Sequence, residues 1–274
     1  MKVLDNMTFR IVELLMRRQD LNSRTWIHKL LKKCFIGDMN QLCISLGTLS
    51  LEKPVSVLTL NLNHLRISAQ NQGFKKTYLL GDYILADGMP IRWIANRLLN
   101  TQVNRLSGVD LVFNLIQSEA SLSVVGSSRD TVMNALEKIG KDNFQIPVFE
   151  GQISNDASDE EIRAVLEFID LSKKRFVLLA LTTEKQLALI QKISESSAAT
   201  PAIYIGVGGS FDMISGKYLR APKTIQNAGL EWFWRAIQNP KILIPRYSKD
   251  FLFLFGFLFS SRWLGKEEKH EELP

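Results

Sequence analysis

The sequence predicts an α/β fold in which helices cover both faces of a mainly parallel β-sheet. Three near-continuous apolar runs have the length and composition of buried strands: 55–60 (VSVLTL), 175–181 (RFVLLAL) and 202–207 (AIYIGV). Segments with helical periodicity separate them, and strands that alternate with helices usually form a parallel sheet buried on both sides. The 274 residues suffice for one such domain with an appendage.

The first half of the core alternates short apolar runs with helical patterns. The expected elements are a strand at 55–60, a helix at 64–70, a strand at 83–85 and helices at 91–99 and 108–117. Residues 86–88 (Ala-Asp-Gly) are a turn signal, and Pro90 suits the first turn of the helix that follows. We therefore expect this turn at the carboxyl end of a strand.

The second half shows the same alternation more openly. The expected elements are strands at 121–126, near Val148, at 175–181 and at 202–207, with helices at 129–139, 158–171 and 184–195. Ser158 and Glu161 have the spacing of a capping box, which marks the start of a helix. Ligands of an open parallel sheet bind at the carboxyl ends of its strands, so the loops that follow the strands form the candidate site.

Both ends of the chain are basic, and the sequence divides into three parts. Residues 1–50 form a basic N-terminal extension, helical to about residue 35, with a lead-in to the core; residues 51–222 form the α/β core that would hold the catalytic site, and residues 223–274 a basic and apolar appendage. Residues 1–37 hold eight Lys or Arg against three Asp or Glu, and residues 215–265 hold eight against two. Nucleic acid or an anionic membrane would both suit such charge. Aromatic and leucine side chains among the C-terminal charges favour the membrane, so no nucleic-acid partner is expected.

The longest apolar run, residues 251–260 (FLFLFGFLFS), is too short to span a bilayer, which takes about 20 apolar residues. Its basic flanks suit a helix at the membrane interface, but its phenylalanines alternate, as in a strand or in a helix that is apolar on all sides. The run therefore docks on the membrane or packs on the core or on another subunit. Residues 1–15 lack the apolar stretch of a signal peptide, and we expect a cytoplasmic protein at the inner face of the cell membrane.

No metal site or cofactor site is expected. Cys34 and Cys43 have no second pair of ligands at zinc spacing, the three histidines are scattered, and no Asp-x-Asp pair is present. A nicotinamide or S-adenosylmethionine enzyme would need a Gly-x-Gly-x-x-Gly loop after its first strand, and this loop is missing. A bound diphosphate would have to be met by Arg, Lys or helix N-termini.

Three loops and two acids are the candidates for chemistry. Residues 59–61, 126–128 and 206–209 offer small or polar side chains and backbone N–H groups that suit a phosphate or a sugar, although the glycine pair also suits a simple tight turn. Asp87 could serve as a general base or cap the next helix, and spacing alone favours the cap. Asp212, after a Gly-rich turn, has the same two interpretations.

The segment after residue 220 combines tryptophans with basic side chains. Arg235, Lys241 and Arg246 could bind a diphosphate, the arginines through bidentate hydrogen bonds, or they could lie on a solvated or lipid-facing basic surface. Trp232 and Trp234 suit packing in a core.

An ordered set of motifs resembles the bacterial WecG/TagA/CpsF glycosyltransferases over about residues 51–253. The pieces are VLTLNLNHL at 57–65, ADGMPI at 86–91, RLSGVDL at 105–111, SVVGSS at 123–128, IGVGGSFDMISGKYLRAP at 205–222 and GLEWFWRAIQNPKILIPRY at 229–247. The last two pieces are the most specific.

The resemblance implies a Rossmann-like core with a C-terminal membrane-docking appendage. It also implies an inverting, metal-independent transfer of a sugar from a UDP-sugar to a polyprenyl-diphosphate-linked acceptor in bacterial cell-surface or exopolysaccharide synthesis. Asp87 would be the catalytic base. The substrate-binding residues would be Thr59, Asn61, Arg105, Gly126, Gln186, Gly208, Gly209, Asp212, Arg220, Arg235 and Arg246.

One segment departs from the family pattern. Members commonly carry Gly-x-Pro-[Lys/Arg]-Gln-Glu after the strand that corresponds to 175–181, and here residues 181–187 read LTTEKQL. Lys185 and Gln186 agree, while the Gly and Pro that shape the turn and the final Glu are absent. Two alternatives follow: donor recognition is adjusted, or the chain is a weakly active or non-catalytic membrane-associated partner of a polysaccharide assembly. A homo-oligomer is also possible.

Overall fold

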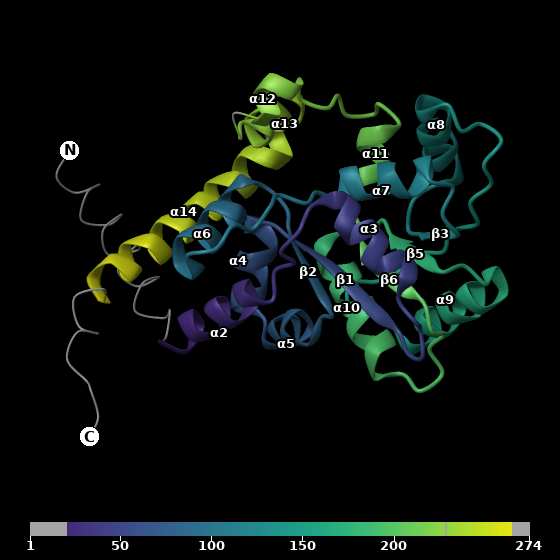
Figure 1. Cartoon of the computed structure of the whole chain (residues 1–274), viewed down its shortest axis with the longest axis horizontal. Coiled ribbons are helices and arrows are strands. Elements are labelled where there is room, and N and C mark those ends of the chain that lie inside the picture. The colour runs from purple at the N-terminus through teal and green to yellow at the C-terminus, as the bar shows by residue number, and fades with distance from the viewer. Residues whose placement is uncertain (1–20, 228, 265–274) are drawn as a thin grey trace.

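The computed structural model describes residues 21–227 and 229–264, and Figure 1 shows their arrangement around one sheet. The first described helix, α2 (Leu21–Lys32), carries the basic pattern expected near the N-terminus. The rest of the predicted N-terminal helix lies outside the described residues.

Six strands form one sheet in which every pair is parallel, in the order β2-β1-β6-β5-β3-β4. The strands are β1 (Val55–Leu60), β2 (Tyr83–Ala86), β3 (Leu122–Val125), β4 (Val148–Phe149), β5 (Phe176–Leu179) and β6 (Ile203–Gly206). The predicted mainly parallel α/β sheet is confirmed. Its strands end together, so the loops after β1, β2, β3, β5 and β6 share one edge.

Alternating strand residues feed two apolar cores, one on each face of the sheet. Leu58, Leu179 and Tyr204 point into a core shared with α2, α4, α5, α6, α9 and α10. Val57 and Leu178 point into the other, shared with α3, α7, α8 and α11. Because successive strand side chains point to opposite faces, predominantly apolar strands require helices on both faces, as predicted.

The core helices have these bounds: α3 Met39–Thr48, α4 Leu62–Gln70, α5 Gln72–Leu80, α6 Met89–Leu99, α7 Gly108–Gln117, α8 Arg129–Ile139, α9 Asp159–Ser172, α10 Thr183–Glu195 and α11 Ser210–Ile214. The patterns predicted α7 and α8 to the residue and α9 from its capping box. They missed α3 and α5. A capping box between Asp38 and Gln41 starts α3 and was a usable signal, whereas Gly73 and the polar start of α5 hide its helical period.

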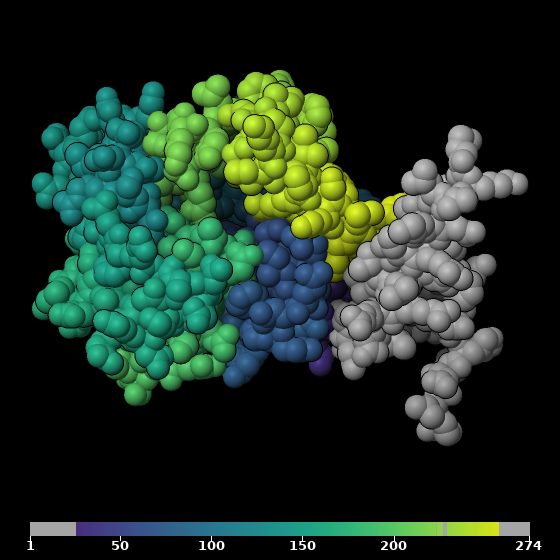
Figure 2. Space-filling model, turned by 180° about the vertical axis from the view of Figure 1, so that it is seen from behind, coloured from purple at the N-terminus to yellow at the C-terminus, as the bar shows by residue number. Residues whose placement is uncertain are grey.

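The C-terminal helices are α12 (Lys223–Asn227), α13 (Glu231–Gln238) and α14 (Pro240–Leu264). The phenylalanine-rich run is helical, so its strand-like interpretation is wrong. Phe257 is buried in the first core, with Phe253 and Leu254 packed against it, and α14 lies along α4 (Figure 2). Within the described part of the chain, none of the helices is long and apolar enough to cross a membrane.

Candidate functional site

A cavity of about 990 Å³ opens where the strands end, between the core and the C-terminal helices. Its floor comes from the turns after β1, β2, β3, β5 and β6, and α13 and α14 complete its wall. A cavity of this size suits a ligand as large as a nucleotide-sugar.

The structure brings most of the predicted site residues to this cavity. Those that line it are Thr59, Asn61, Asp87, Arg105, Gly126, Gly208, Gly209, Asp212, Arg235 and Arg246. Gln186 does not line the cavity, because its side chain is buried against the backbone of Gly206 in β6. A Cβ added to Gly206 would lie only 3.1 Å from Gln186 Oε1. Arg220 does not line it either, because its Nη2 binds the Asp110 carboxylate at 2.6 Å.

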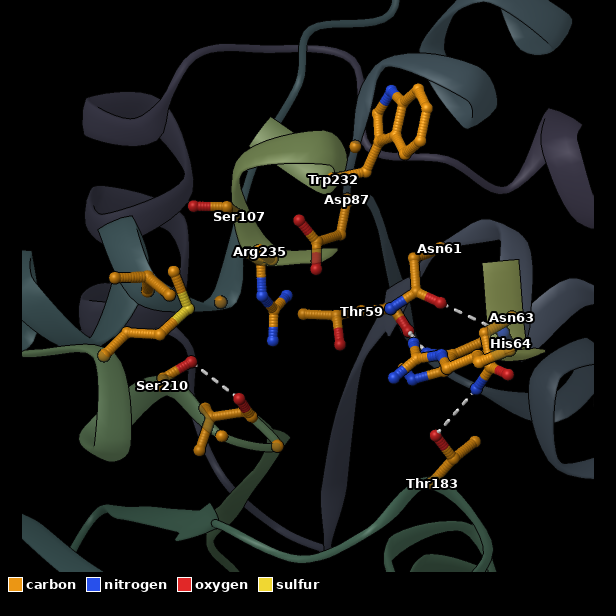
Figure 3. Close-up of a pocket in the computed structure, with 18 of the residues that line it drawn as sticks. Thr59, Asn61, Asn63, His64, Asp87, Ser107, Thr183, Ser210, Trp232 and Arg235 are labelled. Carbon is orange, nitrogen blue, oxygen red and sulfur yellow. Dashed lines mark hydrogen bonds between the residues drawn. The ribbon is translucent and has the colours of Figure 1, made fainter. Parts of the chain in front are cut away.

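Asp87 follows β2 directly, and its backbone N–H donates to the Leu60 carbonyl at 2.9 Å. It is not the cap of α6, because the N-cap is Gly88. Gly88 has φ 94° and ψ 152°, a conformation that is essentially restricted to glycine, so the Asp-Gly pair sets the direction of the turn. The half-buried Asp87 side chain points into the cavity (Figure 3) and receives no hydrogen bond from any described residue.

Burial raises the pKa of Asp87 from its ordinary 3.8 to about 6, and the charge of Glu231 adds to the rise. The nearby charges of Arg105 and Arg235 lower it again. At neutral pH the carboxylate is therefore ionised, and its affinity for a proton is higher than that of an exposed Asp. These are the properties of a general base.

Thr59 and Asn61 form the end of β1 and the start of α4. The Thr59 hydroxyl donates to the Gly206 carbonyl at 3.0 Å, which fixes its direction beside β6. Asn61 caps α4, since its Oδ1 accepts from the backbone N–H of His64 at 3.0 Å. Figure 3 shows the Asn61 amide nitrogen turned toward the cavity, where it can donate to a ligand.

His64 also lines the cavity and was not singled out from the sequence. Its Nδ1 lies 2.7 Å from the Thr59 carbonyl and 2.9 Å from the Tyr78 hydroxyl. A carbonyl only accepts, so Nδ1 carries the proton. Burial lowers the pKa of His64 to about 4, and the ring is neutral at neutral pH. Its position inside NLNHL was the available signal.

Two arginines flank Asp87 from different parts of the chain. Arg105 precedes α7, and its Nη1 donates to the Glu231 carboxylate at 3.0 Å. Arg235, one turn further along α13, has no carboxylate within ion-pair distance among the described residues, and its guanidinium points into the cavity (Figure 3). Arg235 is therefore available to an anionic ligand.

Asp212 caps nothing, because the N-cap of α11 is Gly209 without a side-chain hydrogen bond. Its carboxylate accepts from Lys217 at 3.0 Å, and both residues line the cavity. The positive φ of Gly208, 52°, bends the chain between β6 and α11.

The turn that departs from the family pattern, residues 181–184, forms another part of the cavity wall. Gly126 has φ 98°, and a Cβ there would lie 2.2 Å from Leu181 Cδ2 and 3.0 Å from the Ala180 carbonyl oxygen, so any other residue would force the Leu181 side chain to move. Thr183 begins α10 and its hydroxyl accepts from Asn63 at 3.4 Å. Thr182 and Thr183 both line the cavity, so the residues that differ from the family pattern face the site.

The described residues contain no group of three or more His, Cys, Asp and Glu side chains that could hold a metal ion. The charged groups that line the cavity are mainly arginines and carboxylates, together with Lys217 and Lys249.

Comparison with known proteins identifies the family of this chain. The profile of the glycosyl transferase WecG/TagA/CpsF family matches residues 35–268. A relative from Bacillus spizizenii, named N-acetylglucosaminyldiphosphoundecaprenol N-acetyl-beta-D-mannosaminyltransferase, is 27% identical over 187 residues, which cover 65% of this chain and 71% of the relative. The matched segment contains the strand-end turns, Asp87 and the C-terminal arginines, so the chain belongs to the WecG/TagA/CpsF family and is a glycosyltransferase.

Proposed function

We propose that this glycosyltransferase moves a sugar from a UDP-sugar to a polyprenyl-diphosphate-linked glycan, with inversion at the anomeric carbon and without a metal ion. The reaction would serve bacterial cell-surface or exopolysaccharide synthesis. The name of the Bacillus relative supports the acceptor class, since it specifies a diphosphoundecaprenol-linked N-acetylglucosamine.

The proposal depends above all on the Asp87 carboxylate, which is ionised, free of hydrogen bonds from described residues and directed into the cavity. An acceptor hydroxyl placed beside it would lose its proton to Asp87 as its oxygen attacks the anomeric carbon. The bond from that carbon to the phosphate oxygen breaks, and UDP leaves with the electron pair. One direct displacement of this kind inverts the configuration.

An arginine would stabilise the charge that grows on the departing diphosphate. Arg235 on α13 is available for this role, since it lines the cavity and has no carboxylate partner among the described residues. The backbone at Gly208 and Gly209 reaches the same space. Preorganised cations and N–H groups in a partly dry site stabilise such charge, and this is why we propose that no metal is needed.

The C-terminal helices would also contact the membrane that holds the acceptor. Apolar side chains are exposed along α13 and α14: Phe233, Ile237, Ile242, Ile244, Leu252 and Phe255. Lys241 and Lys249 are exposed on the same helix α14. Exposed apolar and basic side chains on one helix suit the interface of an anionic bilayer, in our proposal the inner face of the cell membrane.

The test is Asp87→Asn, assayed for sugar transfer from UDP-sugars to a polyprenyl-diphosphate-linked N-acetylglucosamine. We expect kcat to fall about 10³-fold or more while thermal unfolding remains cooperative. Turnover within a few-fold of the wild type in the Asn variant would disprove the assignment of Asp87. No transfer by the wild type with any UDP-sugar would favour the alternative of a non-catalytic assembly partner.

A further inference from the structure

A polar network crosses the cavity wall where α14 meets α4. Asp250 on α14 is 3% exposed and accepts at Oδ1 from Arg66 Nε of α4 at 2.7 Å. Arg66 Nη2 donates to Asn63 Oδ1 at 3.0 Å, and Asn63 Nδ2 donates to Thr183 Oγ1 at 3.4 Å. Three separate segments of the chain are thus joined around one buried carboxylate.

The same carboxylate faces a second guanidinium, that of Arg246, one helical turn earlier on α14. Asp250 Oδ2 lies 3.8 Å from Arg246 Nε, and this buried nitrogen has no hydrogen-bond partner among the described residues. Asp250, Arg66 and Arg246 all line the cavity. Burial raises the pKa of Asp250 and lowers that of Arg246, so both charges lose hydration that their pairing must offset.

We propose that Asp250 is a positioning residue that acts through Arg246, with Arg66 as its anchor on the core, and that it presents Arg246 to the diphosphate of the lipid-linked acceptor. This inference rests on the proposed function. A buried ion pair contributes little net stability compared with apolar side chains of the same shape, so seating α14 does not by itself require a carboxylate. A carboxylate between two arginines does fix the direction of a guanidinium that would otherwise extend to solvent.

The position of Arg246 favours the acceptor diphosphate over that of the donor. Arg246 lies on the helix that exposes Leu252 and Phe255, which suits the lipid end of an acceptor. The donor diphosphate has cations and backbone elsewhere, at Arg235 and at the glycine turn after β6.

A double-mutant cycle separates positioning from simple attachment of α14. Asp250→Asn should raise KM for the lipid-diphosphate acceptor about tenfold, with kcat and donor KM changed less than about twofold. In an Arg246→Gln background, the same change should have less than about a twofold further effect, because its target is gone. Equal effects in both backgrounds, or an unchanged acceptor KM in the single variant, would overturn the inference.

Two further variants test whether a raised acceptor KM could come merely from the loss of an ion pair or from a loosened α14. Arg66→Met/Asp250→Leu replaces the buried pair by apolar side chains and should keep α14 seated, yet it must still show the raised acceptor KM. Recovery of the wild-type KM in this double variant would mean that the pair only attaches α14. Lys76→Gln breaks an exposed ion pair with Glu195 outside the cavity and should leave both KM values unchanged.

A binding measurement keeps the inference separate from the proposed function. We would titrate inorganic pyrophosphate into the UDP-saturated full chain by calorimetry. The wild type should bind it, and Asp250→Asn should bind it about tenfold more weakly. Equal binding by the two proteins, or none by the wild type, would contradict the role of Asp250. Failure of the wild type to transfer sugar would instead count against the proposed function.

Discussion

The cavity wall from the core is held by hydrogen bonds to the backbone at the strand ends, whereas the wall from α13 and α14 is joined to the core by ion pairs between residues far apart in the sequence. Thr59 and Ser210 are 4% and 2% exposed, and their hydroxyls donate to backbone carbonyls at 3.0 and 2.6 Å. The C-terminal helices attach through Arg105–Glu231 and Arg66–Asp250, at 3.0 and 2.7 Å.

This difference predicts that substitutions in one wall mainly affect stability and substitutions in the other mainly affect catalysis. Changes at the buried, hydrogen-bonded positions of the core wall, such as Thr59 and Ser210, disturb segments that also form the apolar cores, so they should destabilise the protein. Changes in the C-terminal wall remove charges that face the cavity and should spoil catalysis while the fold survives. Ring contacts of Trp232 with Phe251 and Tyr247, at 4.9 and 5.9 Å between centroids, keep α13 and α14 together.

The largest loss of stability should come from Gly126→Ala in the core wall. The new Cβ would lie 2.2 Å from Leu181 at a φ of 98°. We expect the free energy of unfolding to fall by about 3 kcal/mol or more, measured by urea denaturation. Gly140→Ala is the matched control: its φ is also positive, 73°, but nothing lies within 4 Å of its Cβ, so the loss should be about 1 kcal/mol. Equal losses would show that the turns after β3 and β5 can separate.

Arg235→Ala tests the C-terminal wall. We expect kcat to fall about 10²-fold, or about 2.7 kcal/mol, because the leaving diphosphate loses a cation. The free energy of unfolding should change by less than about 1 kcal/mol. Lys241→Ala, on α14 but outside the cavity, removes the same charge and should retain kcat with a detergent-solubilised acceptor. A large loss of stability in Arg235→Ala would contradict the proposal that the C-terminal wall contributes to catalysis rather than to stability.

The pH dependence reports on Asp87. Activity requires its carboxylate, so kcat/KM should fall about tenfold per pH unit below about 6 and level off above it. The folded pKa is raised above the ordinary 3.8, so ionisation disfavours folding. Asp87→Asn should therefore be more stable than the wild type by on the order of 2 kcal/mol above pH 6, with the gain shrinking as the pH falls from about 6 and vanishing about one pH unit below 3.8. An undiminished gain at about pH 3 would rule out this linkage.

The smallest effect should be a tuning of that profile by the C-terminal helices. Glu231 raises the pKa of Asp87 and Arg235 lowers it. Glu231→Gln should move the acidic limb of kcat/KM to lower pH, and Arg235→Gln should move it to higher pH. Shifts in the same direction would mean that these side chains act on Asp87 through structure rather than charge.

Local patterns predicted much of the fold and part of the site. Period-two and period-3.6 patterns gave the buried strands and most core helices, and the Ala-Asp-Gly turn located Asp87 at the end of β2. The same patterns left open whether Asp87 was a cap or a base, because both occur at such a turn. Only the backbone of Gly88 and the open space beyond the carboxylate distinguish the two.

Contacts between distant segments could not be predicted from the sequence. Arg105 and Glu231 are 126 residues apart, and Arg66 and Asp250 are 184 residues apart. Arg220 has the same basic side chain as Arg235, yet it pairs with Asp110 away from the cavity wall. From the sequence alone, Arg220 and Arg235 were equally good candidates for the site.

The sequence by itself determined the parallel sheet, the family and an acid at a strand end, because these depend on short-range patterns and ordered motifs. The tertiary structure alone decided that α14 is helical, that it closes the cavity over α4 and that Asp250 faces two arginines there. The physical reason is that burial raises or lowers the pKa of a side chain and selects its charge partner, and burial exists only once the chain is packed.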